Sequence, residues 1–343
     1  MTRRTVSAAV LAAATAFAAP AAAETMVLQS IYPSSLPLLG ESGRVLTERL
    51  LELTDGELRV EWNEPGAIVP GGEIWDAVST GAVDAGWYSP GFADTIIPSA
   101  AIFTAVPFGP DVRAYTAWWY YGGGKELWAE ISAPFGIHTE LCAILVPEAS
   151  GWFREPIESP DQLRGMNMRI FGLGAQVMQK LGAQAQSLPP ADTMTALRLG
   201  TIDAAEFSFP AIDYQFGFHE YADHLYFPAW HQQTSLITLI VNQDRWDGLS
   251  TRHRAIIEDA CAANVARTAA RGEAIQLEPL ANIEAAGVTI HTWNDEMMDA
   301  FRNAWEELAA EKSAQDEDFR RALESLESFR EQFATWSDLA YMD

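Results

Sequence analysis

Short apolar runs alternate with amphipathic stretches along most of the chain. Apolar residues that are consecutive or alternate predict strands, whereas apolar residues spaced three and four apart predict helices. The predicted strands lie at residues 26–31, 57–62, 137–146 and 288–291, and the main predicted helices at 38–54, 175–181 and 250–286. This alternation predicts an α/β fold with helices on both faces of its sheets.

One pattern occurs twice, displaced by 119 positions. Residues 77–89 (AVSTGAVDAGWYS) and 196–208 (ALRLGTIDAAEFS) each end a helix at a glycine, Gly81 or Gly200, and then enter a buried strand. Each copy delivers polar and aromatic side chains at the C-terminal end of a strand, where ligands bind in open α/β sheets. The repeat therefore predicts two similar lobes with a cleft between them.

The first 23 residues have the features of a secretory signal peptide. They contain Arg3 and Arg4, an uncharged apolar stretch and an A-x-A cleavage site before Glu24. The apolar stretch is shorter than the about 20 residues that a spanning helix needs. We therefore expect an exported, soluble protein from which residues 1–23 have been removed.

Beyond residue 23 the chain carries 20 basic and 47 acidic residues, a net charge of −27. So acidic a protein is not expected to bind nucleic acid or anionic lipid. The same charge hinders the binding of an anion, which raises the importance of any buried arginine or metal ion.

Two cysteines occur, Cys142 in an apolar run and Cys261 in a helical pattern. A secreted scaffold held by disulfides would use more. Two buried free thiols are favoured, and a bridge is not excluded.

Arg169 is the first candidate for ligand binding. It lies in MNMRIFG, a predicted strand that leads into a helix. A planar guanidinium can pair both oxygens of a carboxylate, and the free amides of a helix N-terminus add positive charge. A surface ion pair is the alternative, but the apolar neighbours Met168 and Ile170 favour burial.

Glu148 and Glu206 are expected in the same cleft, where they would repel a bound anion. A cation such as Ca²⁺ or Na⁺ would remove the conflict, as would protonation or solvent exposure. The sequence contains no G-x-S-x-G, H-E-x-x-H or C-x-x-C motif, and its six histidines show no metal-type spacing. The residues favour a molecule that closes around a small carboxylate. An exported glycosidase-like enzyme that uses the two glutamates, and a carbohydrate receptor with tryptophan stacking, stay open.

Several segments together resemble the periplasmic solute-binding proteins of TRAP transporters, the DctP type, over nearly the whole chain after residue 23. They are PGGEIWDAVSTGAVDAG, TAVPFG, AWWYYGGG, SGWFREPI, GMNMRIFG, GTIDAAEF and FPAW. The TAVPFG, triple-glycine and GWFR segments are more like the 2-oxo acid-binding branch. The resemblance implies a type II-like fold with two α/β lobes and a long bridging helix. It also implies a receptor, not an enzyme, that hands a carboxylate to a TRAP membrane permease.

The resemblance also implies roles for individual residues. Arg169 would grip the solute carboxylate, and in the 2-oxo acid branch a cation would be held by Glu206, Glu148, Gln232 and the backbone carbonyl of Phe207. The branch usually has Gln where this chain has Glu148, and Glu where it has Gln232, so the total charge is kept. The solute stays open between a 2-oxo or 2-hydroxy monocarboxylic acid, a dicarboxylate and a sugar acid. The aromatic residues expected to wall the pocket are Trp87, Tyr88, Phe209 and Trp230.

We expect residues 24–146 and about 236–265 to form lobe I. Residues 147–235 and about 266–343 would form lobe II with the C-terminal helices. The last helix is amphipathic, and it either packs on its own lobe, which is favoured, or makes a homodimer. Its apolar positions are Phe319, Leu323, Leu326 and Phe329.

Overall fold

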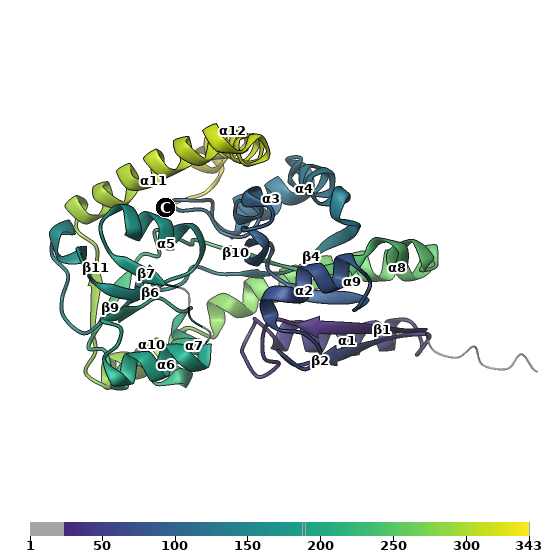
Figure 1. Cartoon of the computed structure of the whole chain (residues 1–343), viewed down its shortest axis with the longest axis horizontal. Coiled ribbons are helices and arrows are strands. Elements are labelled where there is room, and N and C mark those ends of the chain that lie inside the picture. The colour runs from purple at the N-terminus through teal and green to yellow at the C-terminus, as the bar shows by residue number, and fades with distance from the viewer. Residues whose placement is uncertain (1–23, 187, 189, 343) are drawn as a thin grey trace, which may run out of the picture.

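The structure is a computed structural model that describes residues 24–342 except 187 and 189. The predicted signal peptide, residues 1–23, lies outside the described residues. Figure 1 shows two lobes side by side, with the purple and blue N-terminal part on the right and the teal part on the left. Each lobe contains one mixed sheet with helices around it. The predicted α/β class with two lobes is confirmed.

The sheet of the first lobe has the strand order β2-β1-β3-β10-β4. Its strands are β1 (Glu24–Ser30), β2 (Leu58–Asn63), β3 (Ala85–Tyr88), β4 (Ile137–Leu145) and β10 (Ser235–Asn242). The accompanying helices are α1 (Glu41–Leu53), α2 (Ile74–Ser79), α3 (Val112–Tyr121), α4 (Gly124–Ser132), α8 (Gln243–Gly248) and α9 (Thr251–Ala274).

The sheet of the second lobe has the order β11-β9-β5-β8-β6-β7. Its strands are β5 (Gly151–Phe153), β6 (Asn167–Arg169), β7 (Gln184–Gln186), β8 (Ala204–Ala205), β9 (His224–Phe227) and β11 (Thr289–Thr292). The remaining helices are α5 (Gly172–Lys180), α6 (Pro190–Leu199), α7 (Pro210–Phe216), α10 (Leu277–Ala285), α11 (Asp295–Gln315) and α12 (Glu317–Ala340). Within the described residues, no helix combines the length and the apolar character that a membrane crossing requires.

The two sheets share one pairing scheme. In the first lobe β1 lies parallel between β2 and β3, and β3 pairs antiparallel with β10. In the second lobe β6 lies parallel between β7 and β8, and β8 pairs antiparallel with β5. The lobes are therefore built alike around β1 and β6.

The sequence repeat maps onto this scheme. Gly81 and Gly200 both have left-handed φ angles, of 74° and 70°, as the helix-stop pattern predicts. Asp84 then exchanges two hydrogen bonds with the backbone of Val27, whose N–H donates to Oδ2 at 2.7 Å. Asp203 makes the same exchange with Asn167, whose N–H donates to Oδ2 at 2.9 Å. Each aspartate thus locks a helix end to the neighbouring parallel strand.

Four segments connect the lobes: residues 146–150 between β4 and β5, residues 228–234 between β9 and β10, helix α9 with α10, and the junction of α11 with α12. The N-terminal end of α9 is capped by Ser250, whose hydroxyl accepts from the backbone N–H of His253 at 3.0 Å. Helix α9 packs on β4 and α1 of the first lobe, and α10 packs on α7 of the second. The lobes are therefore joined by ordered crossovers.

The prediction of a single helix over residues 250–286 was wrong in one respect. The structure divides this stretch into α9 and α10, with Ile275 and Gln276 between them. Pro279 explains the break. A proline lacks an N–H and its ring clashes with the carbonyl four residues earlier, here that of Ile275. The break lies where the chain passes from the first lobe to the second.

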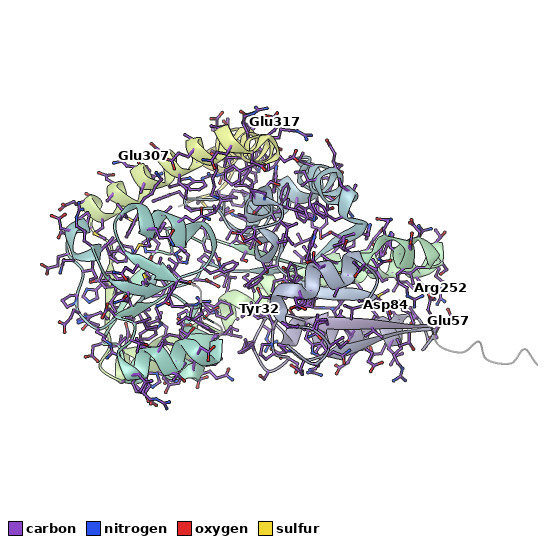
Figure 2. The ribbon with its side chains drawn as sticks, in the orientation of Figure 1. Tyr32, Glu57, Asp84, Arg252, Glu307 and Glu317 are labelled. Atoms are coloured by element: carbon purple, nitrogen blue, oxygen red, sulfur yellow. A yellow bond between two sulfur atoms is a disulfide. The ribbon has the colours of Figure 1, made fainter. Side chains whose placement is uncertain are left out.

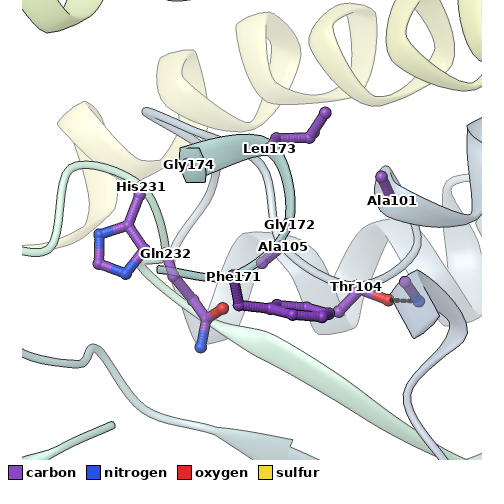
Figure 3. Close-up of a pocket in the computed structure, with 10 residues that line it drawn as sticks. Ala101, Thr104, Ala105, Phe171, Gly172, Leu173, Gly174, His231 and Gln232 are labelled. Carbon is purple, nitrogen blue, oxygen red and sulfur yellow. Dashed lines mark hydrogen bonds between the residues drawn. The ribbon is translucent and has the colours of Figure 1, made fainter. Parts of the chain in front are cut away.

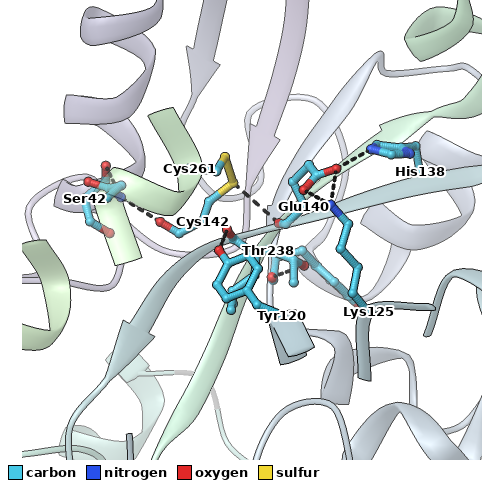
Figure 4. The surroundings of a disulfide bond; sticks show 11 residues. Ser42, Tyr120, Lys125, His138, Glu140, Cys142, Thr238 and Cys261 are labelled. Atoms are coloured by element: carbon cyan, nitrogen blue, oxygen red, sulfur yellow. Dashed lines mark hydrogen bonds and ion pairs between the residues drawn. A yellow bond between two sulfur atoms is a disulfide. The ribbon is translucent and has the colours of Figure 1, made fainter. Parts of the chain in front are cut away.

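Cys142 and Cys261 form a disulfide, so the preference for free thiols was wrong. Strand β4 and helix α9 bring the two Cα atoms to 4.0 Å from each other. The adjacent Asn264 of α9 donates to the carbonyl of Cys142 at 2.8 Å and thereby holds the same contact. Figure 4 shows the bridge with Ser42 on one side and the ion-paired Glu140 on the other. The bridge fastens the lobe-spanning helix to the first lobe.

The last helix, α12, packs within its own chain. It contacts α3, α4 and a short 3₁₀ turn at Pro98–Ala101, and Figure 1 shows it at the top of the molecule near α3. Phe319 and Leu326 of its predicted apolar face are buried, and the other two positions are half-buried against the core. We expected residues 266–343 to accompany the second lobe. Helix α11 does contact α5 there, whereas α12 lies on the first lobe because its apolar face packs on α3 and α4.

The disulfide should contribute measurably to stability. The double variant Cys142→Ala/Cys261→Ala is expected to lose roughly 2–5 kcal/mol of unfolding free energy, because the bridge closes a loop of 119 residues in the unfolded chain. Urea unfolding of the variant and of the wild-type protein, each with and without dithiothreitol, measures this. The reductant should lower the stability of the wild-type protein alone. An equal response of the two proteins would mean that the bridge does not stabilise the fold.

Candidate functional site

A cavity of about 500 Å³ lies between the lobes. Its volume is within the roughly 300–1,000 Å³ typical of small-molecule sites. Tyr32 and Ser89 line it from the first lobe, Arg169 and Glu206 from the second, and Glu148 from a connecting segment. Figure 2 places Tyr32 between the two lobes. The cavity is therefore the candidate ligand site.

Arg169 lies at the end of β6 and lines this cavity with only 8% of its surface exposed. Its Nη1 donates to both the backbone carbonyl and the carboxylate of Glu206, the latter at 3.0 Å. Its Nε donates to the carbonyl of Leu188 at 3.4 Å, and its guanidinium lies 5.1 Å from the ring centre of Phe207. Among the described residues no acceptor pairs with Nη2. Part of the guanidinium fork is thus available to a solute.

Glu206 directly follows β8, and β8 pairs with β6, the strand that ends at Arg169. Its backbone N–H donates to the carbonyl of Arg169 at 2.8 Å, and its carboxylate accepts from the N–H of Phe171 at 3.3 Å. Burial opposes ionisation of this carboxyl, but Arg169 and His231 outweigh it and hold the pKa of Glu206 below its usual value. Glu206 is therefore an ionised carboxylate in a buried ion pair.

Glu148 and Gln232 lie on the two strand connections, not in either lobe. Glu148 follows β4, and its Oε1 accepts from the hydroxyl of Ser208 at 3.2 Å. Burial is the main reason that the pKa of Glu148 lies well above its usual value, and the nearby Glu206 and Asp213 raise it further. Gln232 precedes β10 and lines the same cavity. The structure thus brings together Arg169, Glu148, Glu206, Phe207 and Gln232, as the sequence analysis expected.

His231 belongs to this cluster and was missed. Its Nε2 lies 3.7 Å from Oε1 of Glu206, and neither ring nitrogen has a hydrogen-bond partner among the described residues. One side-chain ligand atom each from His231, Glu148 and Glu206 lies within 4.8 Å of the others. No spacing rule could have found it, because the three residues come from three separate segments.

These residues fit a cation. Ca²⁺ binds oxygen ligands at 2.3–2.6 Å, so two ligands of one ion lie at most about 5 Å apart. The separation of 4.8 Å meets that limit. Burial and then the neighbouring Glu206 raise the pKa of Glu148, so two buried carboxyl groups face a single guanidinium. A cation would be held by Glu148 and Glu206, with Gln232 adjacent, and would supply the positive charge that Arg169 alone does not.

A third acid, Asp213 of α7, lies beneath the site and was also missed. Its Oδ2 accepts from the indole N–H of Trp152 at 2.7 Å. Its Oδ1 has no partner among the described residues. Burial, together with the nearby Glu206, raises the pKa of Asp213 to about 8 despite the indole hydrogen bond. Asp213 is therefore a neutral acid at pH 7.

The four aromatic residues expected to wall the pocket are not among those that line the cavity in the described structure. Trp87 is buried in the first lobe, where its indole N–H donates to the carbonyl of Leu39 at 2.7 Å. Tyr88 and Phe209 are fully buried, and the ring of Trp230 stacks on that of Phe301 at 4.3 Å. These residues do lie near strand ends, as the sequence indicated, but their rings are packed in the hydrophobic core and do not face the cavity.

Other aromatic residues meet across the lobes instead. Phe171, at the start of α5, contacts Phe92 with ring centres 4.6 Å apart. Beside it is a small space of about 10 Å³, roughly the room for one water molecule. Figure 3 shows Phe171 between Gln232 and Thr104 there. Phe171 therefore closes one side of the candidate site against the first lobe.

Asp213 makes stability depend on pH in an unusual direction. The unfolded carboxyl ionises near 3.8 and the folded one near 8, so the folded state holds the extra proton between these values and loses stability as pH rises through them. Asp213→Asn keeps an acceptor for Trp152 and removes this loss. Its Tm should exceed that of the wild-type protein by roughly 3–7 °C at pH 9, with a much smaller difference at pH 4.5.

The exposed Asp161→Asn is the control for Asp213→Asn, because it removes an acid of the same lobe that is in contact with solvent. Scanning calorimetry at both pH values compares the two variants. If the difference between Asp213→Asn and the wild-type protein did not change with pH, the assignment of a raised pKa to Asp213 would be wrong.

Comparisons with known proteins agree with this geometry. Residues 30–316 match the DctP family, described as bacterial extracellular solute-binding protein, family 7. A monocarboxylate 2-oxoacid-binding periplasmic protein of Nostoc sp. is 30% identical over 292 residues, which is 85% of this chain and 80% of that protein.

Two solved structures share the fold closely. A TRAP transporter solute-binding protein of Bordetella bronchiseptica, with calcium and picolinate bound, has a TM-score of 0.90 and 32% identity over 93% of this chain and 95% of that one. A TRAP periplasmic solute-binding protein of Pseudoalteromonas atlantica, with sodium and pyruvate bound, has a TM-score of 0.88 and 28% identity over 93% and 97% of the two chains. The chain therefore belongs to the DctP family of extracellular solute-binding proteins, as its sequence motifs predicted.

Proposed function

We propose that this protein is the periplasmic receptor of a TRAP transporter, which binds a small 2-oxo or 2-hydroxy monocarboxylate and delivers it to the membrane permease. The observation that carries the proposal is a buried arginine, Arg169, with part of its fork unused, in a cavity between two lobes. A carboxylate can take two hydrogen bonds from such a fork. Lobes joined by such connecting segments can close on the bound carboxylate, as in other two-lobe binding proteins.

The relatives support the solute class. The Nostoc protein is named for monocarboxylate 2-oxo acids, and the two solved structures contain pyruvate and picolinate, which are both monocarboxylates. The cavity itself points the same way, because Arg169 is the one lining residue among those described that carries a permanent positive charge. A second carboxylate would find no counterion there.

We further propose that a cation, Ca²⁺ or Na⁺, binds next to Arg169. Its ligands would be Glu148, Glu206, the amide oxygen of Gln232 and the backbone carbonyl of Phe207. A solute carboxylate between Arg169 and two glutamates would otherwise face excess negative charge in a medium of low polarity. Both related structures contain such a cation, calcium in one and sodium in the other. We do not include a homodimer in the proposal, because the apolar face of α12 packs within the chain.

Arg169→Ala is expected to weaken solute binding at least 100-fold, because it removes two charge-assisted hydrogen bonds worth roughly 1.5–3 kcal/mol each. Isothermal titration with pyruvate and related acids measures this. Arg164→Ala, which removes an exposed arginine of the same lobe, should bind like the wild-type protein. Since Arg169→Ala also leaves Glu206 without its partner, Arg169→Lys is a second variant that keeps the charge but not the fork. Wild-type affinity in both Arg169 variants would rule out the proposed contact.

Removing the cation should abolish tight solute binding. Thermal-shift titrations in a sodium-free buffer with a chelator are expected to show no stabilisation by the solute, and either CaCl₂ or NaCl should restore it, since the stabilisation follows ligand occupancy. Glu206→Gln should prevent the restoration, while Glu73→Gln, at an exposed residue outside the cavity, should not. Undiminished binding without either ion would show that Arg169 suffices and that no cation takes part.

A further inference from the structure

One loop of the first lobe holds both ends of the connection that carries Gln232. This loop, residues 104–108, lies beside the connection. The carbonyl of its first residue accepts from the backbone N–H of Leu236 at 3.1 Å, and the N–H of its last residue, Phe108, donates to the carbonyl of Trp230 at 2.6 Å. Gln232, which lines the cavity, lies between these two hydrogen bonds in the chain. The 104–108 loop therefore fixes the backbone on either side of a residue of the candidate site.

Phe108 has a backbone conformation that needs support from its surroundings. Its φ angle is 54°, in the left-handed region, where a residue with a Cβ is strained and persists only if neighbouring groups hold it. Two arginines of the C-terminal helices do so. Nη2 of Arg330 in α12 donates to the carbonyl of Phe108 at 2.8 Å, and Cζ of Arg302 in α11 lies 4.2 Å from the centre of its ring. Both backbone polar groups of Phe108 are thus bonded to other segments.

Helix α12 is a firm support for Arg330. Gly122, directly after α3, lies so close to this helix that an added Cβ would be 2.6 Å from Cδ2 of Phe329. The indole N–H of Trp118 in α3 donates to the hydroxyl of Ser325 at 3.1 Å. The helix is therefore closely packed on the first lobe up to the residue before Arg330, and close packing leaves its side chains little room to shift.

Helix α11 meets the same connection from the second lobe. The ring of Phe301 stacks on that of Trp230, with centres 4.3 Å apart, and the ring of Phe108 lies 6.1 Å from Trp230. The helix itself is fastened to α5, where Nζ of Lys180 pairs with the carboxylate of Glu311 at 2.8 Å. Trp230 thus contacts a ring from each of two segments, one in the first lobe and one in the second.

Among the described residues, none that lines the cavity belongs to α11 or α12. Resting on the proposed function, we propose that these helices nevertheless set the affinity for the solute, with Phe108 and Arg330 as positioning residues. Arg330 holds Phe108 in its left-handed conformation, and Phe108 holds the carbonyl of Trp230. The next two residues are His231 and Gln232 of the site. Without the Arg330 contact, Gln232 occupies its binding position in only a fraction of the molecules, and the apparent affinity falls by that fraction.

Hydrogen exchange of the ligand-free protein tests the first step. Mass spectrometry measures exchange in the peptides that contain Phe108 and Leu236. In Arg330→Ala their hydrogen-bonded N–H groups should exchange roughly 10-fold faster than in the wild-type protein, because local opening becomes easier. Arg320→Ala is the control, since it removes an arginine of α12 that pairs with two acids of its own helix, and it should exchange like the wild-type protein. Unchanged exchange of both peptides in Arg330→Ala would overturn the inference.

Titration calorimetry with pyruvate, in the presence of Ca²⁺ and Na⁺, tests the second step. Arg330→Ala should weaken pyruvate binding roughly 10-fold, because substitutions remote from a site shift its equilibria by about 2- to 30-fold. Arg330→Lys keeps a cationic donor on a long side chain and should bind within about threefold of the wild-type protein. Arg320→Ala should not change the affinity. Wild-type affinity in Arg330→Ala would show that the helices have no influence on the site.

A double-mutant cycle distinguishes positioning from a general loss of stability. Gln232→Ala removes the side chain that Arg330 is proposed to position, and it should itself weaken pyruvate binding. Adding Arg330→Ala to it should then weaken binding by less than about threefold, because residues that act through one contact are not additive. If Arg330→Ala had the same effect with and without Gln232→Ala, Arg330 would act on the site by another route and the inference would be wrong.

The outcomes separate this inference from the proposed function. If the wild-type protein binds neither pyruvate nor lactate, the proposed function fails, and the effect on solute affinity fails with it. The exchange measurement contains no ligand and decides independently whether Arg330 orders the connection. If the wild-type protein binds pyruvate and Arg330→Ala binds it equally well, the receptor function stands and the positioning role is wrong.

Discussion

The burial of two carboxylates beside a single guanidinium is the constraint on which the site depends. Arg169 compensates Glu206, whose pKa is lowered, but it does not compensate Glu148, whose pKa is raised. Buried charge without a partner is among the most costly features a fold can contain. With both carboxyls ionised, the site is one positive charge short of balance, and the proposed cation would supply that charge.

The position of these groups explains how binding can be linked to movement of the lobes. Arg169 and Glu206 are attached to adjacent strands of one sheet, whereas Glu148 and Gln232 belong to the segments about which the lobes would rotate. The disulfide between Cys142 and Cys261 anchors α9 to one lobe only. A change of lobe angle would therefore involve the strand connections, the region around Ile275, where the long helical stretch is interrupted, and the junction of α11 with α12.

The sequence predicted the parts of the site that depend on local patterns. A strand end before a helix identified Arg169, and the repeated glycine–aspartate turn led to Glu206. Residues whose role depends on tertiary packing were missed. His231 and Asp213 are in no motif and acquire their importance only when separate segments converge. The pairing of the cysteines was missed for the same reason, and the aromatic residues near the strand ends were expected at the pocket although the core takes up their rings.

The matched pairing of the two sheets has one more consequence. By strand register, Gln29 of β1 faces Gly86 just as Arg169 of β6 faces Ala205, so the two side chains occupy equivalent places in the two halves. The amide of Gln29 is saturated by backbone groups of Ser30, Glu64 and Ile68. In the first lobe this position holds a glutamine that fastens the adjacent loop, whereas in the second lobe it holds Arg169, which lines the ligand cavity. Two lobes built on the same pairing scheme thus contribute unequally to the binding of the solute.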